Sequence, residues 1–304
     1  MLSDPNATIK SCSSISSTGV IGENLNSKKI IDKLNLIKTK SSNDIFGASK
    51  AIMTTDTFPK TNIQYVKSNS KKIRVFGFAK GSGMIAPNMG TMLAYIFIEA
   101  NLSKKFLNSL IKKNIDSTFN SISVDGDTST SDTVMLFAVG SNNFYKKMNQ
   151  STYKKISLAI AQVMMNLSKQ IVSDGEGISK LIEVNVFKAK TKKQAHNVAF
   201  SIAESSLVKT AVAGGDANWG RIVAAIGKAD KGIKQNKIII KFNNFVLAKK
   251  GAAYTKINIK KIDSYMKNKT IKINIDLGIG KFYKKVLSSD LTHKYIKINS
   301  DYRS

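Results

Sequence analysis

The sequence is poor in the residue types that build disulfide frameworks, metal sites and membrane spans. Cys12 is the single cysteine of 304 residues, and His196 and His293 are the only histidines, which leaves little material for a zinc site. No run approaches the ~18 apolar residues that a spanning helix needs, and the N-terminus lacks the apolar core of a signal peptide. We therefore expect a cytoplasmic protein with no structural metal and no membrane partner.

Arginine is also scarce, although the chain is strongly basic. Lysine and arginine together number 48 against 20 acidic residues, yet only three of them, Arg74, Arg221 and Arg303, are arginines. A charge of +28 can attract nucleic acid, but arginine is the side chain that reads phosphates and bases with two parallel hydrogen bonds. The lysines are scattered through every segment, which is typical of a solvated surface. We expect no nucleic-acid partner.

The hydrophobic content and its periodicity predict a mixed fold. Hydrophobic residues make up 42% of the chain, enough for a large buried core in one or two domains. Apolar runs with strand and helix spacing alternate along the chain and are separated by Gly-rich and Asp-rich loops. The sequence predicts strands at 91–99, 134–140 and 181–189, helices at 102–113, 143–172 and 192–205, and antiparallel strands from about 237, including KIIIKF, TIKINID and KYIKINSDY. The predicted class is α/β (α+β), with layered sheets and helices.

The stretch KGSGMIAPNMGTMLAY contains a candidate nucleophile, Thr91. A threonine hydroxyl is a poor nucleophile at neutral pH, but an N-terminal threonine has its own base, an α-amine with a pKa of about 7.7 to 8. Exposing that amine requires a cut between Gly90 and Thr91, which Thr91 Oγ can start by attacking the preceding carbonyl. Gly90 suits this reaction because it lacks a Cβ and tolerates a strained peptide. Taken alone, the same residues also fit an ordinary Gly-Thr turn before a strand.

Longer motifs connect this stretch to a known family. KGSGMIAPNMGTMLAYIF resembles the self-cleavage segment of the ornithine acetyltransferases, also called bifunctional glutamate N-acetyltransferases, of arginine biosynthesis. Other segments resemble the same family in the same order along the chain. They are STGVIGE at 17–23, AIMTTDTFPK at 51–60, ISVDGDTSTSDTV at 122–134, DGEG at 174–177, SSLVKTAVAGGDANWGRIVAAIGKA at 205–229 and INSDYRS at 298–304. The resemblance covers nearly the whole chain.

The resemblance implies an architecture and an assembly. The expected fold is a layered α-β-β-α arrangement with a C-terminal β-rich part. Cleavage is expected to give an alpha-chain portion, residues 1–90, and a beta-chain portion, residues 91–304, which begins with the nucleophile Thr91. The alpha portion is expected to be N-terminally shortened relative to the family. Two alpha and two beta chains are expected to form a heterotetramer, with no cofactor and with acetyl-CoA as a possible co-substrate.

The resemblance also assigns roles to individual residues. Thr18 and Gly19 match the pair that stabilises the oxyanion, a role that suits a hydroxyl and a backbone N–H. The substrate contacts of the family fall on Thr54, Lys80, Thr91, Glu176, Asn299 and Ser304. The ammonium of Lys80 suits an α-carboxylate, and the carboxylate of Glu176 suits an α-ammonium. Ser304 stands where the family usually has threonine, and Gly90 stands where many relatives have alanine. Without the resemblance, Thr18 and Gly19 fit a simple turn and Glu176 fits a solvated acidic turn.

Three functions are consistent with these residues. The first is a glutamate N-acetyltransferase that moves acetyl from N2-acetyl-L-ornithine to L-glutamate through an acetyl-Thr91 intermediate, with acetyl-CoA-dependent synthesis of N-acetylglutamate left open. The second is a self-cleaving amidase or aminopeptidase that releases its acyl group to water. The third is a basic binding protein that has lost enzymatic activity. Self-cleavage separates the third from the other two, and glutamate-dependent capture of acetyl separates the first from the second.

Overall fold

The computed structural model describes residues 16–39, 44–68, 71–86, 92–129, 131–140, 148–256 and 258–301. The elements in chain order are α1 (Ser27–Thr39), α2 (Ile45–Ala51), β1 (Lys60–Ser68), β2 (Lys71–Lys80), β3 (Leu93–Ile98), α3 (Lys104–Asn114), η1 (Ile115–Ser117), η2 (Phe119–Ser121), β4 (Ile122–Ser123), β5 (Thr133–Ala138), α4 (Gln150–Ser173), β6 (Leu181–Ala189), α5 (Lys192–Ala203), α6 (Ser206–Ala213), α7 (Trp219–Ala229), η3 (Gln235–Lys237), β7 (Ile239–Phe242), β8 (Phe245–Lys249), β9 (Ala252–Ala253), α8 (Ile259–Met266), β10 (Thr270–Asp276), β11 (Phe282–Ser289) and α9 (His293–Asp301).

The first sheet, called sheet A here, has the strand order β1-β2-β3-β5. The β1–β2 and β2–β3 pairs are antiparallel and the β3–β5 pair is parallel. The ladder between β2 and β3 runs from the pair Val75 and Ile98 to the pair Lys80 and Leu93. Residues 87–91 therefore belong to the connection between two paired strands. A cut between Gly90 and Thr91 would leave both pieces hydrogen-bonded through this ladder.

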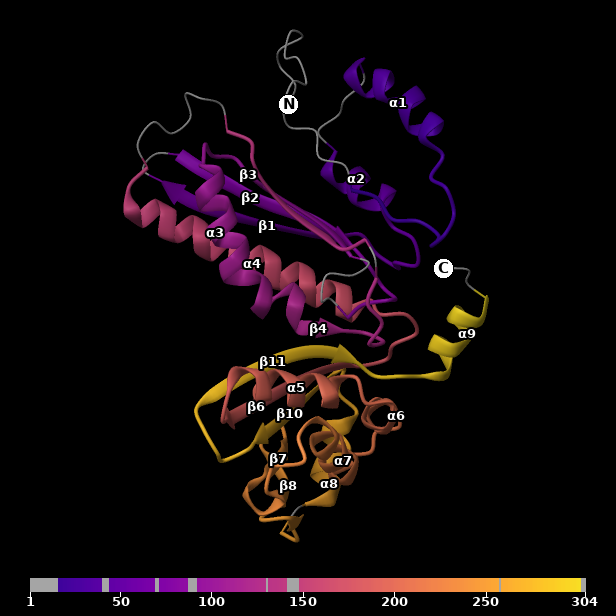
Figure 1. Ribbon diagram of the computed structural model, residues 1–304, viewed down its shortest axis with the longest axis vertical. Coiled ribbons are helices and arrows are strands. Elements are labelled where there is room, and N and C mark those ends of the chain that lie inside the picture. The colour runs from indigo at the N-terminus through magenta and orange to yellow at the C-terminus, as the bar shows by residue number, and fades with distance from the viewer. Residues whose placement is uncertain are drawn as a thin grey trace.

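Helix α4 covers one face of sheet A (Figure 1). Alternate residues of β2 and β3 point to this face, as the period of two in a strand requires. They are fully buried and include Ile73, Val75, Ala94 and Ile96. The helix contributes a stripe at helical spacing, with Ile156, Ile160, Val163, Leu167 and Ile171 all fully buried. This packing forms the core between sheet A and α4.

The other face of sheet A is aromatic. Phe76 of β2, Phe97 of β3 and Phe137 of β5 stack across the sheet, with ring centroids 5.2 and 5.1 Å apart. Such cross-strand aromatic pairs stabilise a sheet beyond the area that they bury. At the β1 edge, Tyr65 remains 54% exposed. This face is thus less completely covered than the face beneath α4.

The second sheet, sheet B, has the order β4-β11-β6-β10-β7-β8-β9. Its β6–β10 and β4–β11 pairs are parallel and the remaining pairs are antiparallel. Helix α5 packs on β6 and β11, and α7 packs on α5. Helix α4 also contacts β4 and β11, so it lies between the two sheets (Figure 1). The predicted layered α/β class is confirmed.

One predicted element is wrong. The segment KYIKINSDY was expected to be a strand, but His293–Asp301 forms helix α9. Its alternating isoleucines favour a strand locally, and tertiary contacts override that preference. Tyr295 and Asn299, one helical turn apart, both reach side chains of other loops, Asp125 and Glu176. A strand would send residues four apart to one face at a much longer spacing.

Candidate active site

A buried ion cluster lies where β1 begins, and we call Asp56, Lys60 and Asp174 the buried charge cluster. Lys60 is completely buried, and its Nζ lies 2.5 Å from Asp56 Oδ1 and 2.6 Å from Asp174 Oδ2. Burial by itself raises the pKa of Asp56, but the Gly81 amide and the Lys60 ammonium outweigh it, so the pKa ends below its usual range. The cluster joins the AIMTTDTFPK and DGEG motifs, which lie far apart in the sequence.

The two aspartates of this cluster also hold the loops around the site, Asp56 through its carboxylate and Asp174 through its backbone carbonyl. Asp56 Oδ1 accepts a hydrogen bond from the Gly81 amide at 2.8 Å. Ser82 Oγ donates to the carbonyl of Asp174 at 2.5 Å, and the Glu176 amide donates to the Ser82 carbonyl at 3.2 Å. The end of β2 and the DGEG turn are therefore fixed against each other. A buried pair that is bonded this completely favours one arrangement of the loops.

Lys80 is the last residue of β2 and is 3% exposed. Its Nζ donates a hydrogen bond to Thr54 Oγ1 at 3.3 Å. Burial lowers the pKa of Lys80, and the charge of nearby Lys60 lowers it further. The carboxylates of Asp56, Asp132 and Glu176 oppose this shift. Lys80 is thus a buried ammonium whose hydrogen-bond partner is a neutral hydroxyl, an arrangement suited to binding a carboxylate.

Glu176 is 7% exposed and lies against the backbone of Gly83. A Cβ at Gly83 would stand 2.3 Å from Glu176 Oε2, so a side chain there would displace the carboxylate. Asn299 of α9 donates a hydrogen bond from Nδ2 to Glu176 Oε2 at 2.8 Å. Gly177, with a φ of 65°, lets the DGEG turn approach the Tyr295 amide, which is 2.4 Å from an ideal Cβ position. Helix α9 is docked on the turn in this way.

Two aspartates bind the backbone on either side of residues 87–91. The carboxylate of Asp125 accepts the amides of Met84 and Ile85 at 2.6 and 2.9 Å, and Asp132 Oδ1 accepts the Met92 amide. Met84 has a φ of 53°, a strained value for a residue with a side chain. Both aspartates belong to the ISVDGDTSTSDTV motif. The chain is therefore held at both ends of the connection that contains Gly90 and Thr91.

The structure brings four of the predicted substrate residues into two hydrogen-bonded pairs, Lys80 with Thr54 and Glu176 with Asn299. Lys80 is the last residue of β2 and Glu176 lies against the backbone of Gly83, three residues further on, so the two pairs lie at the same end of β2. Gly90, Thr91 and Ser304 lie outside the described residues. Their predicted roles stay predictions.

Thr18 and Gly19, the predicted oxyanion pair, lie in a described stretch without helix or strand. Ser16, two residues earlier, is hydrogen-bonded through Oγ to the hydroxyl of Tyr95, which places this stretch beside β3. Thr18 is half-buried and Gly19 is exposed. Between the described side chains and amides, no hydrogen bond joins either residue to Lys80 or Glu176. Their oxyanion role stays a prediction.

Sequence reasoning missed five charged residues that organise this site. They are Asp56, Lys60, Asp125, Asp132 and Asp174, and all lie within the motifs that carry the family resemblance. The available signal was composition: in a chain with more than twice as many basic as acidic residues, aspartates inside Gly-rich and Thr-rich loops are unusual. Such aspartates commonly accept backbone N–H groups.

Within the part of the chain that the structure describes, no group of three or more His, Cys, Asp and Glu residues is placed to hold a metal ion. No helix there is both long enough and apolar enough to cross a membrane.

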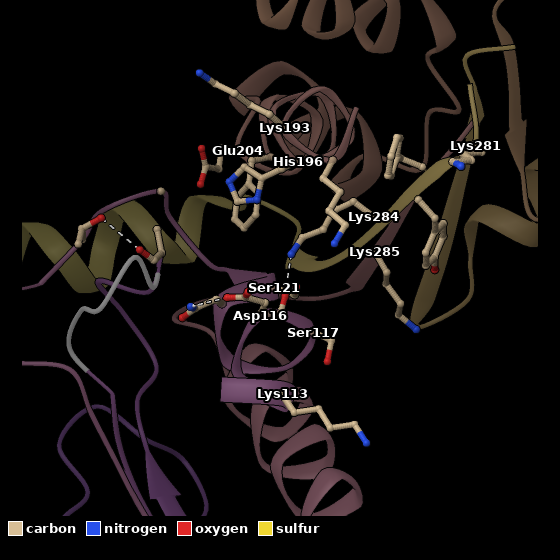
Figure 2. Close-up of a pocket in the computed structure, with 18 residues that line it drawn as sticks. Lys113, Asp116, Ser117, Ser121, Lys193, His196, Glu204, Lys281, Lys284 and Lys285 are labelled. Carbon is tan, nitrogen blue, oxygen red and sulfur yellow. Dashed lines mark hydrogen bonds between the residues drawn. The ribbon is translucent and has the colours of Figure 1, made fainter. Parts of the chain in front are cut away.

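A separate cavity of about 930 Å³ lies between η1, η2, α5 and β11, and we call it the lysine-lined cavity. Its basic lining residues are Lys113, Lys192, Lys193, Lys281, Lys284 and Lys285. In Figure 2, the side chains of Lys113 and Lys193 extend away from each other at opposite ends of the view. Lys284 Nζ donates to the Asp116 carbonyl at 2.8 Å, and Lys285 Nζ lies 2.7 Å from Glu183 Oε2. These ammonium groups do not converge on one point.

The fold and the first of these sites define a class: a layered α/β protein whose site holds a buried cation, Lys80, and a buried anion, Glu176, near the end of β2. Comparison with known proteins gives the family. The sequence model of the ArgJ family matches residues 5–304 of this chain. The arginine biosynthesis bifunctional protein ArgJ of Bradyrhizobium diazoefficiens is 44% identical over 296 residues, covering 95% of this chain and 72% of that protein. The protein of the same name from Bartonella henselae is 44% identical over 293 residues, with the same coverage.

A solved structure agrees. The crystal structure of the arginine biosynthesis bifunctional protein ArgJ from Bacillus halodurans matches with a TM-score of 0.59 and 36% identity, covering 68% of this chain and 98% of that chain. The chain belongs to the ArgJ family. The predicted family is thus confirmed, and so is the prediction of an acyltransferase.

Proposed function

We propose that this protein transfers an acetyl group from N2-acetyl-L-ornithine to L-glutamate through an ester on Thr91. The observation that carries the proposal is the presence of a buried cation, Lys80, and a buried anion, Glu176, near the end of β2. Both substrates have an α-carboxylate, which suits the Lys80 ammonium, and glutamate and the released ornithine have an α-amine, which suits Glu176. An acyltransferase with such a site is suited to amino-acid substrates.

Thr91 acts as the nucleophile after self-cleavage. Thr91 Oγ attacks the carbonyl carbon of Gly90, the C–N bond breaks, and the Oγ proton passes to the departing nitrogen of Thr91. Water then hydrolyses the ester, which leaves a carboxylate on Gly90 and a free α-amine on Thr91. That amine is the base for the next reaction.

Acetyl transfer follows in two half-reactions. Thr91 Oγ attacks the acetyl carbonyl of N-acetylornithine while the α-amine takes the Oγ proton and delivers it to the leaving nitrogen of ornithine. The amine of glutamate then attacks the acetyl ester, the C–O bond breaks, and a proton returns to Oγ. Thr18 and Gly19 stabilise the tetrahedral oxyanion in both half-reactions, a contribution of about 2.7 to 4 kcal/mol for a single donor.

Two findings support cleavage before Thr91. Aspartates bind the backbone at Met84, Ile85 and Met92, and Met84 has a strained positive φ. Only 68% of this chain is enough to cover 98% of the matching solved chain. By contrast, 95% of this chain covers only 72% of the curated relative from Bradyrhizobium diazoefficiens. The solved chain is therefore much shorter than that relative, and its length is close to that of residues 91–304.

The assembly and the second donor stay part of the proposal. Cleaved chains remain joined through the β2–β3 ladder and assemble as a heterotetramer of two alpha and two beta portions. The relatives are named bifunctional, which supports a second activity for them. For this chain, acetyl-CoA is the proposed second acetyl donor, to be tested as an alternative to N-acetylornithine.

The test is transfer of isotopically labelled acetyl from N-acetylornithine with and without glutamate. The expected result is labelled N-acetylglutamate in amounts equal to the ornithine released. Double-reciprocal plots of the initial rate against one substrate should also stay parallel when the concentration of the other substrate is changed. Release of the label as acetate, unchanged by glutamate, would instead show an amidase. Thr91→Ala should remain a single uncleaved chain without activity, and Thr91→Ser, which keeps a hydroxyl, should still cleave.

A further inference from the structure

Lys209 of α6 is a buried cation that the proposed reaction does not use. The residue is 3% exposed, and its Nζ donates to the main-chain carbonyls of Val124 at 2.6 Å and Ser289 at 2.5 Å. The hydroxyls of Ser288 and Ser289 lie 3.3 and 3.4 Å from the same nitrogen. All these partners are neutral oxygens. Because burying an ammonium costs free energy that hydrogen bonds must offset, these contacts call for a reason.

The two carbonyls mark the point where two paired strands stop pairing. The parallel ladder between β4 and β11 ends with the pair Ser123 and Ser288. One residue further along each segment are Val124 and Ser289, whose carbonyls both accept a hydrogen bond from Lys209 Nζ. The ammonium therefore joins the two segments directly beyond the last pair of the ladder.

The first segment continues into Asp125, which holds the end of β2. The Asp125 carboxylate accepts the backbone amides of residues 84 and 85 at 2.6 and 2.9 Å. The amide of the preceding residue, Val124, donates to the carbonyl of residue 85 at 2.6 Å. These contacts fix the chain directly after Gly83, whose backbone lies against the Glu176 carboxylate. The first segment thus determines where one neighbour of Glu176 lies.

The second segment continues into Asp290, which holds the chain that follows the DGEG turn. The Asp290 carboxylate accepts the backbone amides of Ser179 and Lys180 at 2.8 and 3.0 Å, and it also accepts the Ser179 hydroxyl. Beyond Asp290 the chain enters α9, whose Asn299 donates a hydrogen bond to Glu176 Oε2 at 2.8 Å. The second segment thus determines where another neighbour of Glu176 lies.

We propose that Lys209 is a positioning residue for the Glu176 carboxylate, which it places by joining the two segments that lead to Gly83 and Asn299. This inference rests on the proposed function, in which Glu176 binds the α-ammonium of glutamate. Lys209 acts through the hydrogen bonds of the two segments and contacts no substrate. Its loss should therefore weaken the binding of one substrate more than the binding of the other.

The charges around Lys209 support its ammonium form. Burial lowers the pKa of Lys209 to about 8, and the charges of Asp125, Asp290 and Glu204 oppose this shift. At neutral pH most of the side chain is therefore protonated, and an ammonium has three N–H donors. The two aspartates that favour this charge are the same two that hold the segments beyond the ladder.

The test is a comparison of steady-state kinetics for the wild type and Lys209→Met, which keeps an unbranched side chain but removes the ammonium. A misplaced Glu176 should raise the KM for glutamate roughly 10-fold. The α-nitrogen of N-acetylornithine is acylated and uncharged, so kcat/KM for this substrate should change less than about 3-fold. General destabilisation lowers the amount of active enzyme and hence kcat. A lower kcat with an unchanged KM for glutamate would overturn the proposal.

Amide hydrogen exchange gives a second readout that does not depend on activity. In Lys209→Met, exchange should be faster at the amides of residues 84, 85, 179 and 180, which Asp125 and Asp290 bind. Amides in the ladder between β6 and β10 should exchange as in the wild type. Faster exchange at all of these amides alike would show general destabilisation and would contradict the proposal.

Lys209→Gln is the second variant, should Lys209→Met fail to fold. Glutamine has an uncharged NH₂ group that can still donate to the carbonyls, so the KM for glutamate should rise less, by about 3-fold. The wild-type KM in a folded Lys209→Gln protein would overturn the proposal.

A matched control is Lys284→Met, which removes another lysine that donates to a main-chain carbonyl, that of Asp116, at 2.8 Å. Its KM for glutamate should equal that of the wild type, and a rise like that of Lys209→Met would contradict the proposal. The outcomes also separate the two proposals. A wild type that transfers no acetyl to glutamate removes the proposed function, and this inference with it. A wild type that transfers acetyl, with an unchanged KM in the Lys209 variants, removes this inference alone.

Discussion

The two charged regions of this molecule use lysine in opposite ways. In the buried charge cluster, Lys60 is completely buried and contacts two carboxylates at 2.5 and 2.6 Å. In the lysine-lined cavity, Lys285 pairs with Glu183 at 2.7 Å but keeps 37% of its side chain exposed. Removing one partner of a buried ion pair strongly destabilises a protein, whereas an exposed ion pair contributes only about 0 to 1 kcal/mol to its stability. The number of lysines therefore says little about where charge matters.

The same comparison separates the two regions in function. Around Lys80, the ammonium is hydrogen-bonded to the Thr54 hydroxyl, the Glu176 carboxylate is hydrogen-bonded to Asn299, and the charge of Glu176 acts on Lys80. Around the lysine-lined cavity, the basic side chains point in different directions (Figure 2). A substrate that carries both charges is better matched by the first arrangement.

The largest expected effect is on stability, at the buried charge cluster. Lys60→Met removes the cation between Asp56 and Asp174 and should lower the free energy of unfolding by about 3 to 5 kcal/mol, because two carboxylates stay buried together. The matched control, Lys285→Met, should cost about 1 kcal/mol or less. Urea unfolding of both variants measures the difference. Equal losses would show that burial does not separate the two regions.

A smaller effect is expected on catalysis at Lys80. Lys80→Met keeps much of the buried volume but removes the ammonium, and a hydrogen bond to a charged group is worth about 1.5 to 3 kcal/mol. The value of kcat/KM for N-acetylornithine should therefore fall roughly 10-fold to 100-fold. Lys284→Met, in the lysine-lined cavity, should leave kcat/KM unchanged. A fall of similar size in both variants would show that the loss is not specific to Lys80 and would contradict its role in substrate binding.

The third prediction concerns pH and stability in the Thr91→Ala background, where no cleavage is expected. The pKa of Asp132 is about 7 in the folded chain and near 3.8 when unfolded. The contribution of its protonated form to stability is therefore fully present below pH 4 and is lost as the pH rises through 7. Asp132→Asn should thus be more stable than its parent above pH 7, by roughly 1 to 2 kcal/mol after allowance for solvent screening. Below pH 4 the two should unfold alike. A difference in the free energy of unfolding that stays constant between pH 4 and pH 7 would contradict the raised pKa of Asp132.

The smallest effect is expected inside the lysine-lined cavity. Lys113→Ala combined with Lys193→Ala should change the free energy of unfolding by no more than about 0.5 kcal/mol per site, because these side chains extend away from each other. Acetyl transfer measured at low and high salt should match the wild type. A large loss at low salt only would show that the cavity attracts an anionic substrate.

Much of the fold was predictable because its signals are local. The strand at 181–189 and the helix starting at Lys192 have clear periods of two and 3.6, and Thr191 supplies an N-cap through its side chain. Helix α9 was not predictable from its own residues, since Tyr295 and Asn299 are ordered by contacts with distant loops. Local preference fails where tertiary hydrogen bonds decide.

The site was predictable in part for a similar reason. Motif resemblance located Thr54, Lys80, Glu176 and Asn299, which the structure brings together in neighbouring pairs. The residues that hold them were not identified, because Lys60 is one lysine among many and its burial follows only from packing of β1 against α4 and the DGEG turn. Asp132 was missed for the same reason, because its hydrogen bond with the Met92 amide follows from the fold and not from the local sequence.

The most direct measurement is an intact-mass spectrum of the purified wild-type protein before and after brief exposure to N-acetylornithine without glutamate. The account predicts two fragments from the start, divided before Thr91, and then an increase of one acetyl group on the 91–304 fragment alone. Later addition of glutamate should remove that acetyl group. A single intact chain that nevertheless transfers acetyl, or two fragments with no acetyl on the one that begins at Thr91, would contradict it.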